Sequence, residues 1–202
     1  AALQRARPRP PPTRPAVAPG ALEDTPLGPV SAYAPFANGG LKVQPRLVRR
    51  IEAADGTLLW SAEIAPADTV MDARDAYQIT SMLRGVVDGG TAKTIRDMGV
   101  KGPVAGKTGT TNDNVDVWFM GMTPDLVAGV WLGFDRPATL TPGAAGGSLA
   151  APIWGPMMAR HYIGRPPPQA WVPPFGLATA APDRRLVLRA GPPPPAPRAS
   201  PP

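Results

Sequence analysis

The sequence predicts a mixed α/β (α+β) domain, an antiparallel sheet packed with helices, between two disordered Pro-rich tails. Three observations lead to this prediction. Apolar residues recur at helical spacing before residue 90, and short β-prone runs separated by turn residues follow residue 102. Of the 30 prolines, 19 lie in residues 1–20 or 165–202. Pro-dense segments lack backbone donors and bury little apolar surface. We therefore expect 25–163 to fold and 1–24 and 164–202 to be disordered tails.

The folded segment is expected to begin with a short helix and a hairpin. The helix covers residues 29–37 and ends at Asn38-Gly39-Gly40, residues that tolerate positive φ. The β-prone runs 47–53 and 57–60 flank an Asp-Gly pair. Such a pair between two β-prone runs is a strong hairpin signal.

Residues 72–88 give the clearest helix signal. Asp72 is placed to cap the first free amides, and Asp75 lies in the first turn, where a negative charge is favourable. Apolar residues follow at three- and four-residue spacing and form one stripe: Ile79, Met82, Leu83, Val86 and Val87. We interpret this stripe as core packing.

Three β-prone runs follow, at 103–110, 115–122 and 126–134. Turn residues separate them, and such short links predict an antiparallel meander. After a Gly-rich loop at 143–147, Ser148 is expected to cap a last helix that extends to residue 159.

The charge pattern argues against a nucleic-acid-binding protein. The net charge is +6, but residues 1–20 carry four arginines and no acid, and residues 165–202 carry five arginines and one aspartate. The segment between them holds 12 basic and 14 acidic side chains. Nucleic-acid binding needs basic residues clustered on a folded surface, so we expect no nucleic-acid partner.

Other compositional features narrow the possibilities further. The chain has no cysteine, which excludes disulfides, thiol nucleophiles and Cys-based metal sites. No apolar run approaches the roughly 20 residues that span a bilayer, and the start does not resemble a signal peptide. We expect no metal and no cofactor. The single histidine, His161, is expected on the surface, and Asp113 and Asp116 are expected to cap a turn.

The most informative sequence is Gly106-Lys107-Thr108-Gly109-Thr110. A phosphate-binding P-loop requires G-x-x-x-x-G-K-[ST] followed by a helix. The first glycine would fall at position 101, which is Lys101, and the residues after Lys107 are unsuited to a helix. The P-loop interpretation is therefore disfavoured.

The alternative places Lys107-Thr108-Gly109-Thr110 on a strand beside an active site. Lys107 would hold a cation near a substrate carboxylate and assist proton movement at a serine. Thr108 and Thr110 lie two residues apart, so both can point into one cleft. Gly109 removes a side chain where an extended substrate backbone can pair with the strand.

The neighbourhood of this motif resembles the class A penicillin-binding proteins. The segments that carry the resemblance are 31–40, 85–92, 106–121, 126–135 and 147–154, in the family's order, among them Lys-Thr-Gly-Thr-Thr-Asn-Asp and Trp-Phe-Met-Gly. The resemblance covers about residues 25–160. Lys-Thr-Gly is one of three motifs of penicillin-binding proteins and serine β-lactamases, beside Ser-x-x-Lys and Ser-x-Asn types.

The resemblance implies part of a penicillin-binding/β-lactamase-like transpeptidase fold, with Lys107 catalytic and Thr108, Gly109 and Thr110 binding substrate. It implies a periplasmic enzyme, associated with the inner membrane through sequence N-terminal to this chain. Such an enzyme cross-links peptidoglycan stem peptides through an acyl-serine, and β-lactam antibiotics acylate the same serine.

The sequence departs from the family in its serines. None of Ser31, Ser61, Ser81, Ser148 and Ser200 begins a Ser-x-x-Lys or a Ser-x-Asn. Both motifs precede the matched region in the family, so we expect an incomplete fold from which they have been cut off. An acyl-transfer enzyme needs an activated nucleophile, and we expect no transpeptidation by this chain alone. Two hypotheses follow: a part of an acyl-transfer enzyme that functions with its N-terminal half, or a truncated, non-catalytic module that binds peptide, polymer or a partner protein.

Overall fold

The computed structural model describes residues 25–64, 66–179 and 187–189. Of the two segments expected to be disordered, 1–24 lies outside the described residues, and so do residues 180–186 and 190–202 of the segment 164–202. The helices are α1 Leu27–Ala37, α2 Ala73–Asp88, α3 Thr94–Asp97 and α4 Ala151–His161, with a 3-10 turn η2 Asn112–Asn114 and a π turn η3 Gly146–Ala150. The strands are β1 Arg50–Glu52, β2 Leu58–Ser61, β3 Ala105–Thr110, β4 Val117–Met122, β5 Val127–Leu132, β6 Leu177–Thr179 and β7 Val187–Arg189.

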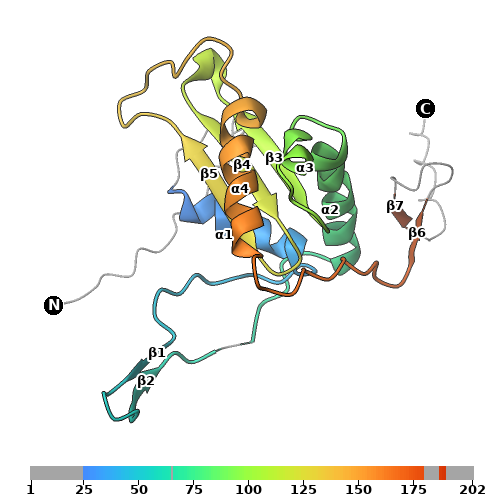
Figure 1. Ribbon diagram of the computed structural model, residues 1–202. Coiled ribbons are helices and arrows are strands. Elements are labelled where there is room, and N and C mark those ends of the chain that lie inside the picture. Colours follow the sequence, from blue (N-terminus) through green and yellow to red (C-terminus); the bar gives the residue numbers. More distant parts are fainter. Residues whose placement is uncertain (1–24, 65, 180–186, 190–202) are drawn as a thin grey trace, which may run out of the picture.

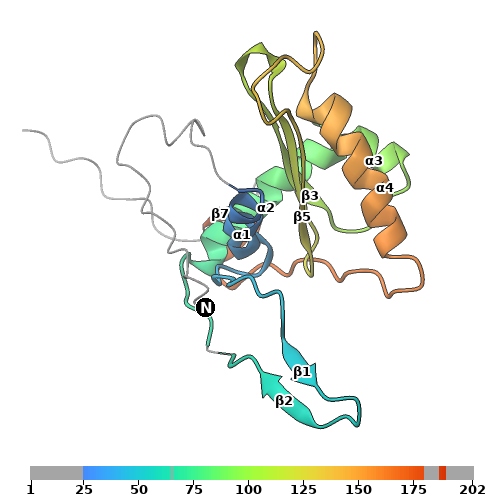
Figure 2. The ribbon, with the colours of Figure 1, turned by 90° about the vertical axis from the view of Figure 1, so that its left-hand side faces the viewer.

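A three-stranded sheet in the order β3-β4-β5 forms the centre of the molecule. Both of its strand pairs are antiparallel, which confirms the predicted meander. Helix α4 packs on one face, while α1 lies on the other. Helix α2 contacts β3, and α2 and α3 lie together along the β3 edge of the sheet (Figures 1 and 2).

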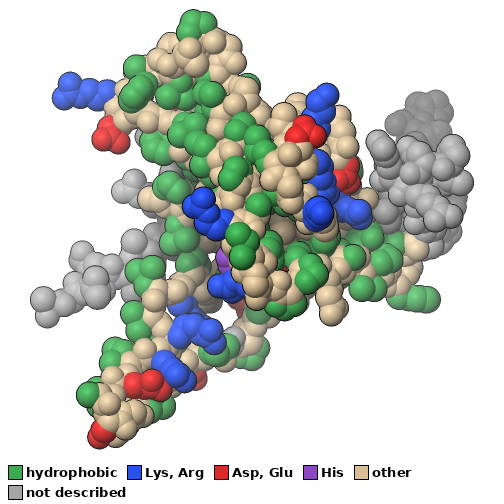
Figure 3. Space-filling model, viewed as in Figure 1, with side chains coloured by type: hydrophobic (Ala, Val, Ile, Leu, Met, Phe, Trp, Pro, Cys, Tyr) green, Lys and Arg blue, Asp and Glu red, His purple; other side chains and the backbone are tan. Residues whose placement is uncertain are grey.

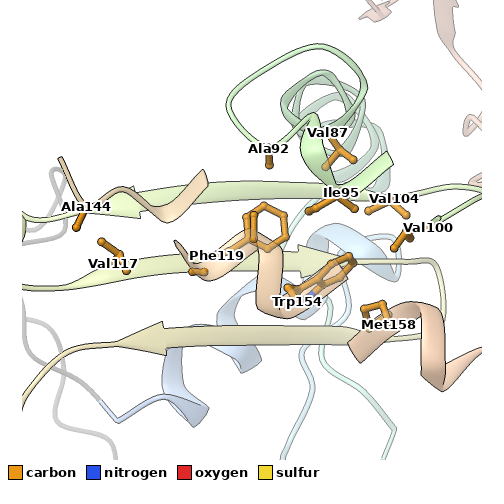
Figure 4. Close-up of a cluster of buried hydrophobic side chains, with 12 residues drawn as sticks. Val87, Ala92, Ile95, Val100, Val104, Val117, Phe119, Ala144, Trp154 and Met158 are labelled. Carbon is orange, nitrogen blue, oxygen red and sulfur yellow. The ribbon is translucent and has the colours of Figure 1, made fainter. Parts of the chain in front are cut away.

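The main core lies between the sheet, α4 and the α2–α3 region (Figure 4). The Trp154 ring meets Phe119 edge-on with centroids 5.3 Å apart, and its indole N–H donates to the Ala128 carbonyl. Gly121 lies beneath this ring, because a Cβ there would stand 2.4 Å from two of its atoms. These contacts fix α4 over β4 and β5, next to the strand β3 that carries the Lys-Thr-Gly-Thr motif.

Helix α2 begins as its sequence predicts. The Asp72 side chain accepts a hydrogen bond from the Arg74 amide, which confirms the cap. The apolar stripe is only partly core: Val87 is fully buried, whereas Met82 is 59% exposed. Thr80, also on α2, is buried. The Thr80 hydroxyl donates a hydrogen bond to the Phe36 carbonyl and so connects α2 to α1.

The predicted hairpin and first helix are both present. Helix α1 is followed by Gly39 and Gly40, which have positive φ. Strands β1 and β2 pair antiparallel and project away from the sheet and helices in both ribbon views (Figures 1 and 2). Every residue of the two strands is exposed.

Two expectations need correction. Ser148 does not cap the last helix: the chain enters α4 through the π turn, where Ser148 Oγ accepts from the Ala145 amide and donates to its carbonyl. Residues 164–179 are also not a free tail. The Trp171 indole donates to the Ala37 carbonyl at 2.9 Å, and its ring joins a second core cluster, because an indole gains by burying its apolar body.

Within the described residues no helix is long and apolar enough to cross a membrane.

Candidate active site

Strand β3 carries the Lys-Thr-Gly-Thr sequence at one edge of the central sheet. Side chains alternate between the faces of a strand, and the pairing with β4 shows how they divide. Thr108 stands opposite Phe119, which belongs to the core beneath α4. Thr110 therefore also points to the α4 face, while Lys107 and Gly109 point to the opposite face. The motif thus presents a cation on one side of the strand and two hydroxyls on the other.

Lys107 is exposed, and its ammonium donates a hydrogen bond to the Thr108 carbonyl at 2.7 Å. The side chain therefore folds along the strand. Gly109, the next residue on this face, has no side chain. A Cβ there would stand 3.2 Å from the Trp118 Cβ. A charged group and an open stretch of backbone consequently lie next to one another.

The backbone of β3 directs hydrogen-bonding groups away from the sheet. The Thr111 amide donates to the Asp116 carbonyl at 3.0 Å, so these two residues form a hydrogen-bonded pair. Antiparallel pairs alternate, which means that Thr108 and Thr110 direct their own N–H and C=O groups toward the free edge. Among the described strands β3 pairs with β4 alone. This edge has the geometry that accepts an extended peptide as an added strand.

The two threonine hydroxyls are held by residues from distant segments. Thr108 Oγ1 lies 2.9 Å from Thr91 Oγ1, in the turn that follows α2. Thr110 Oγ1 accepts a hydrogen bond from the Gly146 amide at 3.2 Å, at the start of the π turn. The strand is therefore fixed on this face from both ends.

Two glycines allow the π turn to lie close against the sheet and against the turn that follows α2. A Cβ on Gly146 would stand 2.1 Å from the Trp118 carbonyl oxygen, and a Cβ on Gly147 would stand 2.1 Å from the Thr91 carbonyl oxygen. Both distances are far below contact, and both neighbours are backbone atoms. Any larger residue here would displace the turn that holds Thr110.

The turn after the motif uses its acidic residues structurally. Asp113 has φ 59°, a left-handed conformation that Asp and Asn adopt more readily than most residues. Asp116 Oδ1 accepts a hydrogen bond from the Trp131 indole at 2.9 Å. These roles agree with the expected turn, and they leave Asp116 paired with an indole rather than with a second carboxylate.

Other sequence predictions can now be placed. His161 lies at the last residue of α4, with its ring edge-on to Tyr162. The described residues contain no cluster of three or more His, Asp or Glu side chains suited to a metal ion. The cavity of about 290 Å³ beside α1, lined by residues such as Val30 and Val127, includes none of the motif residues. The candidate site is therefore an open strand edge and not an enclosed pocket.

Sequence reasoning missed Thr91 and Gly146 as members of this site. Thr91 lies in the segment 85–92 that resembles the family, whereas Gly146 stands one residue before the segment 147–154. The paired glycines signal close backbone approach, but the sequence does not indicate which strand they approach.

Comparisons with known proteins agree with this geometry. The family described as penicillin binding protein transpeptidase domain matches residues 15–159. The match starts before Thr25, so it adds residues 15–24 to the resemblance that the sequence motifs place at about residues 25–160. Penicillin-binding protein 1A of Neisseria cinerea is 40% identical over 141 residues, covering 67% of this chain and 17% of the relative. Penicillin-binding protein 1A of Pseudomonas aeruginosa is 35% identical over 185 residues, covering 67% of this chain and 22% of the relative.

Solved structures show the same similarity. Penicillin-binding protein 1A from Haemophilus influenzae superposes with a TM-score of 0.73 at 28% identity, over 81% of this chain and 30% of that one. The PonA1 protein from Mycobacterium tuberculosis, solved in complex with penicillin V, gives a TM-score of 0.57 at 28% identity, over 82% of this chain and 43% of that one. The chain thus spans about a fifth of the length of the curated relatives that it matches. It belongs to the penicillin-binding protein transpeptidase family.

Proposed function

We propose that this chain supplies the Lys-Thr-Gly-Thr strand of a peptidoglycan transpeptidase site. The reaction cross-links stem peptides through an acyl-serine on a segment outside these 202 residues. The observation that carries the proposal is the state of β3: an edge strand with an exposed lysine and outward-facing backbone groups. The family to which the chain belongs supports the same reaction class.

In this site the substrate peptide lies extended along β3. Its backbone pairs with the outward N–H and C=O groups of Thr108 and Thr110, and Gly109 leaves room for it. The Lys107 ammonium, bonded to the Thr108 carbonyl on the same strand, attracts the carboxylate of the paired peptide. The same charge favours deprotonation of a nearby serine hydroxyl, which makes it a better nucleophile.

We propose that the chain is inactive by itself. Acyl transfer needs a nucleophile with an adjacent base, and none of the five serines has a lysine at the third following position. The parent enzyme would act in the periplasm and be held at the inner membrane through sequence outside this chain.

β-Lactam antibiotics are the proposed ligands of the completed site. A relative that shares the fold over most of this chain has been solved with penicillin V. A β-lactam presents an amide carbonyl and a carboxylate, which are the two groups that a strand edge and a lysine recognise.

The test is labelling with a fluorescent penicillin. The chain is assayed alone and together with a separately produced Ser-x-x-Lys half of the transpeptidase domain of a relative. We expect no label on this chain and label on the added half only when both are present. Label on this chain, or equal labelling of the half without it, would contradict the proposal.

The absence of Ser-x-x-Lys from the sequence also favours a second candidate, a non-catalytic module that binds peptide, polymer or a partner protein. The labelling experiment and a binding measurement together separate the two candidates. A module of this kind would bind a peptidoglycan stem peptide, as measured by calorimetry, yet would leave the added half unlabelled.

A further inference from the structure

The hairpin formed by β1 and β2 is the most exposed apolar element of the described chain. All its strand residues are exposed, including Leu58 at 57%, Leu59 at 63% and Trp60 at 47%. It extends away from the sheet and helices (Figures 1 and 2), and hydrophobic and charged side chains lie together on its surface (Figure 3). An isolated two-stranded hairpin is only marginally stable in water, and exposed apolar clusters mark interaction sites.

The outer edge of β1 is ready to pair. The Ala62 amide donates to the Arg49 carbonyl and the Ala53 amide donates to the Thr57 carbonyl, both at 2.8 Å. Residues 49, 51 and 53 therefore face β2, and alternation directs the backbone groups of Arg50 and Glu52 outward. Among the described strands β1 has β2 as its sole neighbour.

The two edges of the hairpin are not equivalent. Ile51 pairs with Trp60 and Glu52 pairs with Leu58, so the extra residue of the bulge is Leu59, on β2. A bulge disrupts the ladder and tends to end strand pairing. The edge of β1 remains regular, which makes it the edge that accepts another strand.

The sequence of β1, Arg50-Ile51-Glu52, is complementary to itself. We propose that the hairpin joins two copies of this chain by antiparallel pairing of β1 with β1 about a two-fold axis at Ile51. In this register Arg50 stands opposite Glu52 of the second copy. Both residues direct their backbone groups outward, so they form a hydrogen-bonded pair. Ile51 meets its own counterpart in the non-hydrogen-bonded position, where side chains approach most closely.

Charge and apolar contacts favour this register together. Opposite charges directly across an antiparallel pair stabilise it, and like charges destabilise it. Arg50 and Glu52 already form an exposed ion pair at 3.3 Å within one copy, so they lie on one face of the hairpin. Ile51 and Trp60 occupy the other face, which becomes a continuous apolar surface across both copies. The bulge at Leu59 stops further addition, and the assembly closes as a dimer.

Sedimentation velocity of the full 202-residue chain tests this proposal. The wild-type chain is measured from about 1 μM to about 300 μM, a range suited to weak association. We expect a monomer–dimer equilibrium. Arg50→Glu and Glu52→Arg each place like charges opposite one another twice, so each is expected to raise the dissociation constant at least about tenfold.

Charge exchange then identifies the register. In an equimolar mixture of the Arg50→Glu chain and the Glu52→Arg chain, every cross-copy pair is again attractive, and we expect heterodimers. The doubly exchanged variant is expected to dimerise like the wild type. Glu63→Arg makes the same charge change on the same hairpin outside β1 and serves as the control, with the dissociation constant unchanged.

Several outcomes would overturn the proposal. A wild-type chain that remains monomeric over the whole concentration range would show that the hairpin does not pair with a second copy of this chain. Association that survives both single substitutions would place the contact elsewhere, for example on the free edge of β3. A mixture or a double exchange that fails to restore dimers would exclude the register centred on Ile51.

Discussion

The hydroxyls of Thr91 and Thr108 lie 2.9 Å apart, linking the turn after α2 to the strand that carries the motif. This contact is tested by a double-mutant cycle with Thr91→Val and Thr108→Val, read as the free energy of urea unfolding. We expect a coupling of about 0.5–1 kcal/mol, the usual net worth of one hydrogen bond between neutral groups. Strictly additive effects would show that the two hydroxyls do not interact in solution.

Lys107 is expected to control acylation without stabilising the fold. Its side chain is exposed and contacts one backbone carbonyl, so Lys107→Ala should change stability little. In the reconstituted penicillin assay we expect the acylation rate to fall by at least about 100-fold, because an electrostatic and proton-transfer role is lost. Lys101→Ala removes an exposed lysine before the strand and is the matched control. Equal rates for the two variants would remove Lys107 from the site.

Gly146 is expected to tolerate no side chain. A Cβ would stand 2.1 Å from the Trp118 carbonyl oxygen on β4 and 2.8 Å from the Gly109 carbonyl oxygen on β3, so Gly146→Ala forces the π turn off the sheet and should cost about 3 kcal/mol of unfolding free energy. Gly85→Ala is the control, since nothing lies within 4 Å of that position in α2. Alanine there should raise stability by about 0.5–1 kcal/mol. Chemical denaturation measures both, and a neutral Gly146→Ala would refute the close approach.

Local chemistry in the sequence was sufficient to predict α2, the hairpin and the meander. Asp72 caps α2 through a hydrogen bond two residues away, and the Asp-Gly pair turns the hairpin within a few residues. The Thr-Asn-Asp-Asn turn likewise returns β3 to β4. In each case the residues that specify the element also contact one another.

The errors arise where a distant contact decides the outcome. Ser148 has the chemistry of a helix cap, but its hydroxyl bonds Ala145 because the paired glycines bring the chain down onto β3. Met82 follows helical spacing yet is exposed. Within the site, the alternation of side chains along β3 was sufficient to predict that Thr108 and Thr110 share a face. Their hydrogen-bond partners lie 17 and 36 residues away in the sequence, and nothing near the motif indicates them.

Trp171 illustrates the same limit and leads to a stability prediction. Its indole donates to the Ala37 carbonyl across a separation of 134 residues, and its ring packs on the cluster that includes Met122. Trp171→Ala should lower the unfolding free energy by about 2 kcal/mol, the cost of a half-buried ring and one hydrogen bond. Val172→Ala, at a side chain that is 82% exposed, should stay within about 0.5 kcal/mol. Thermal unfolding of both variants checks this, and equal melting temperatures would mean that 164–179 is a free tail after all.

Tyr162 connects the end of α4 to the turn between β4 and β5. Its hydroxyl donates to Asp125 Oδ1 at 2.6 Å and lies 2.8 Å from the buried Thr123 hydroxyl. Burial and the Asp125 hydrogen bond raise the pKa of Tyr162 from 10.0 to about 12. Burial alone would raise the pKa of Asp125, but the hydrogen bonds from Tyr162 and Thr123 lower it below its usual value.

Tyr162→Phe is therefore expected to change how stability depends on pH. At neutral pH the substitution should lower the free energy of unfolding by about 1 kcal/mol, a value kept small because Asp125 is exposed. The raised pKa of Tyr162 gives the wild type stability that is complete below pH 10 and is lost as pH rises toward about 12. The lowered pKa of Asp125 gives stability that is lost as pH falls through its range. Urea unfolding from acid to alkaline pH should show the two proteins converging at both extremes, and a constant difference would show that these groups are not coupled.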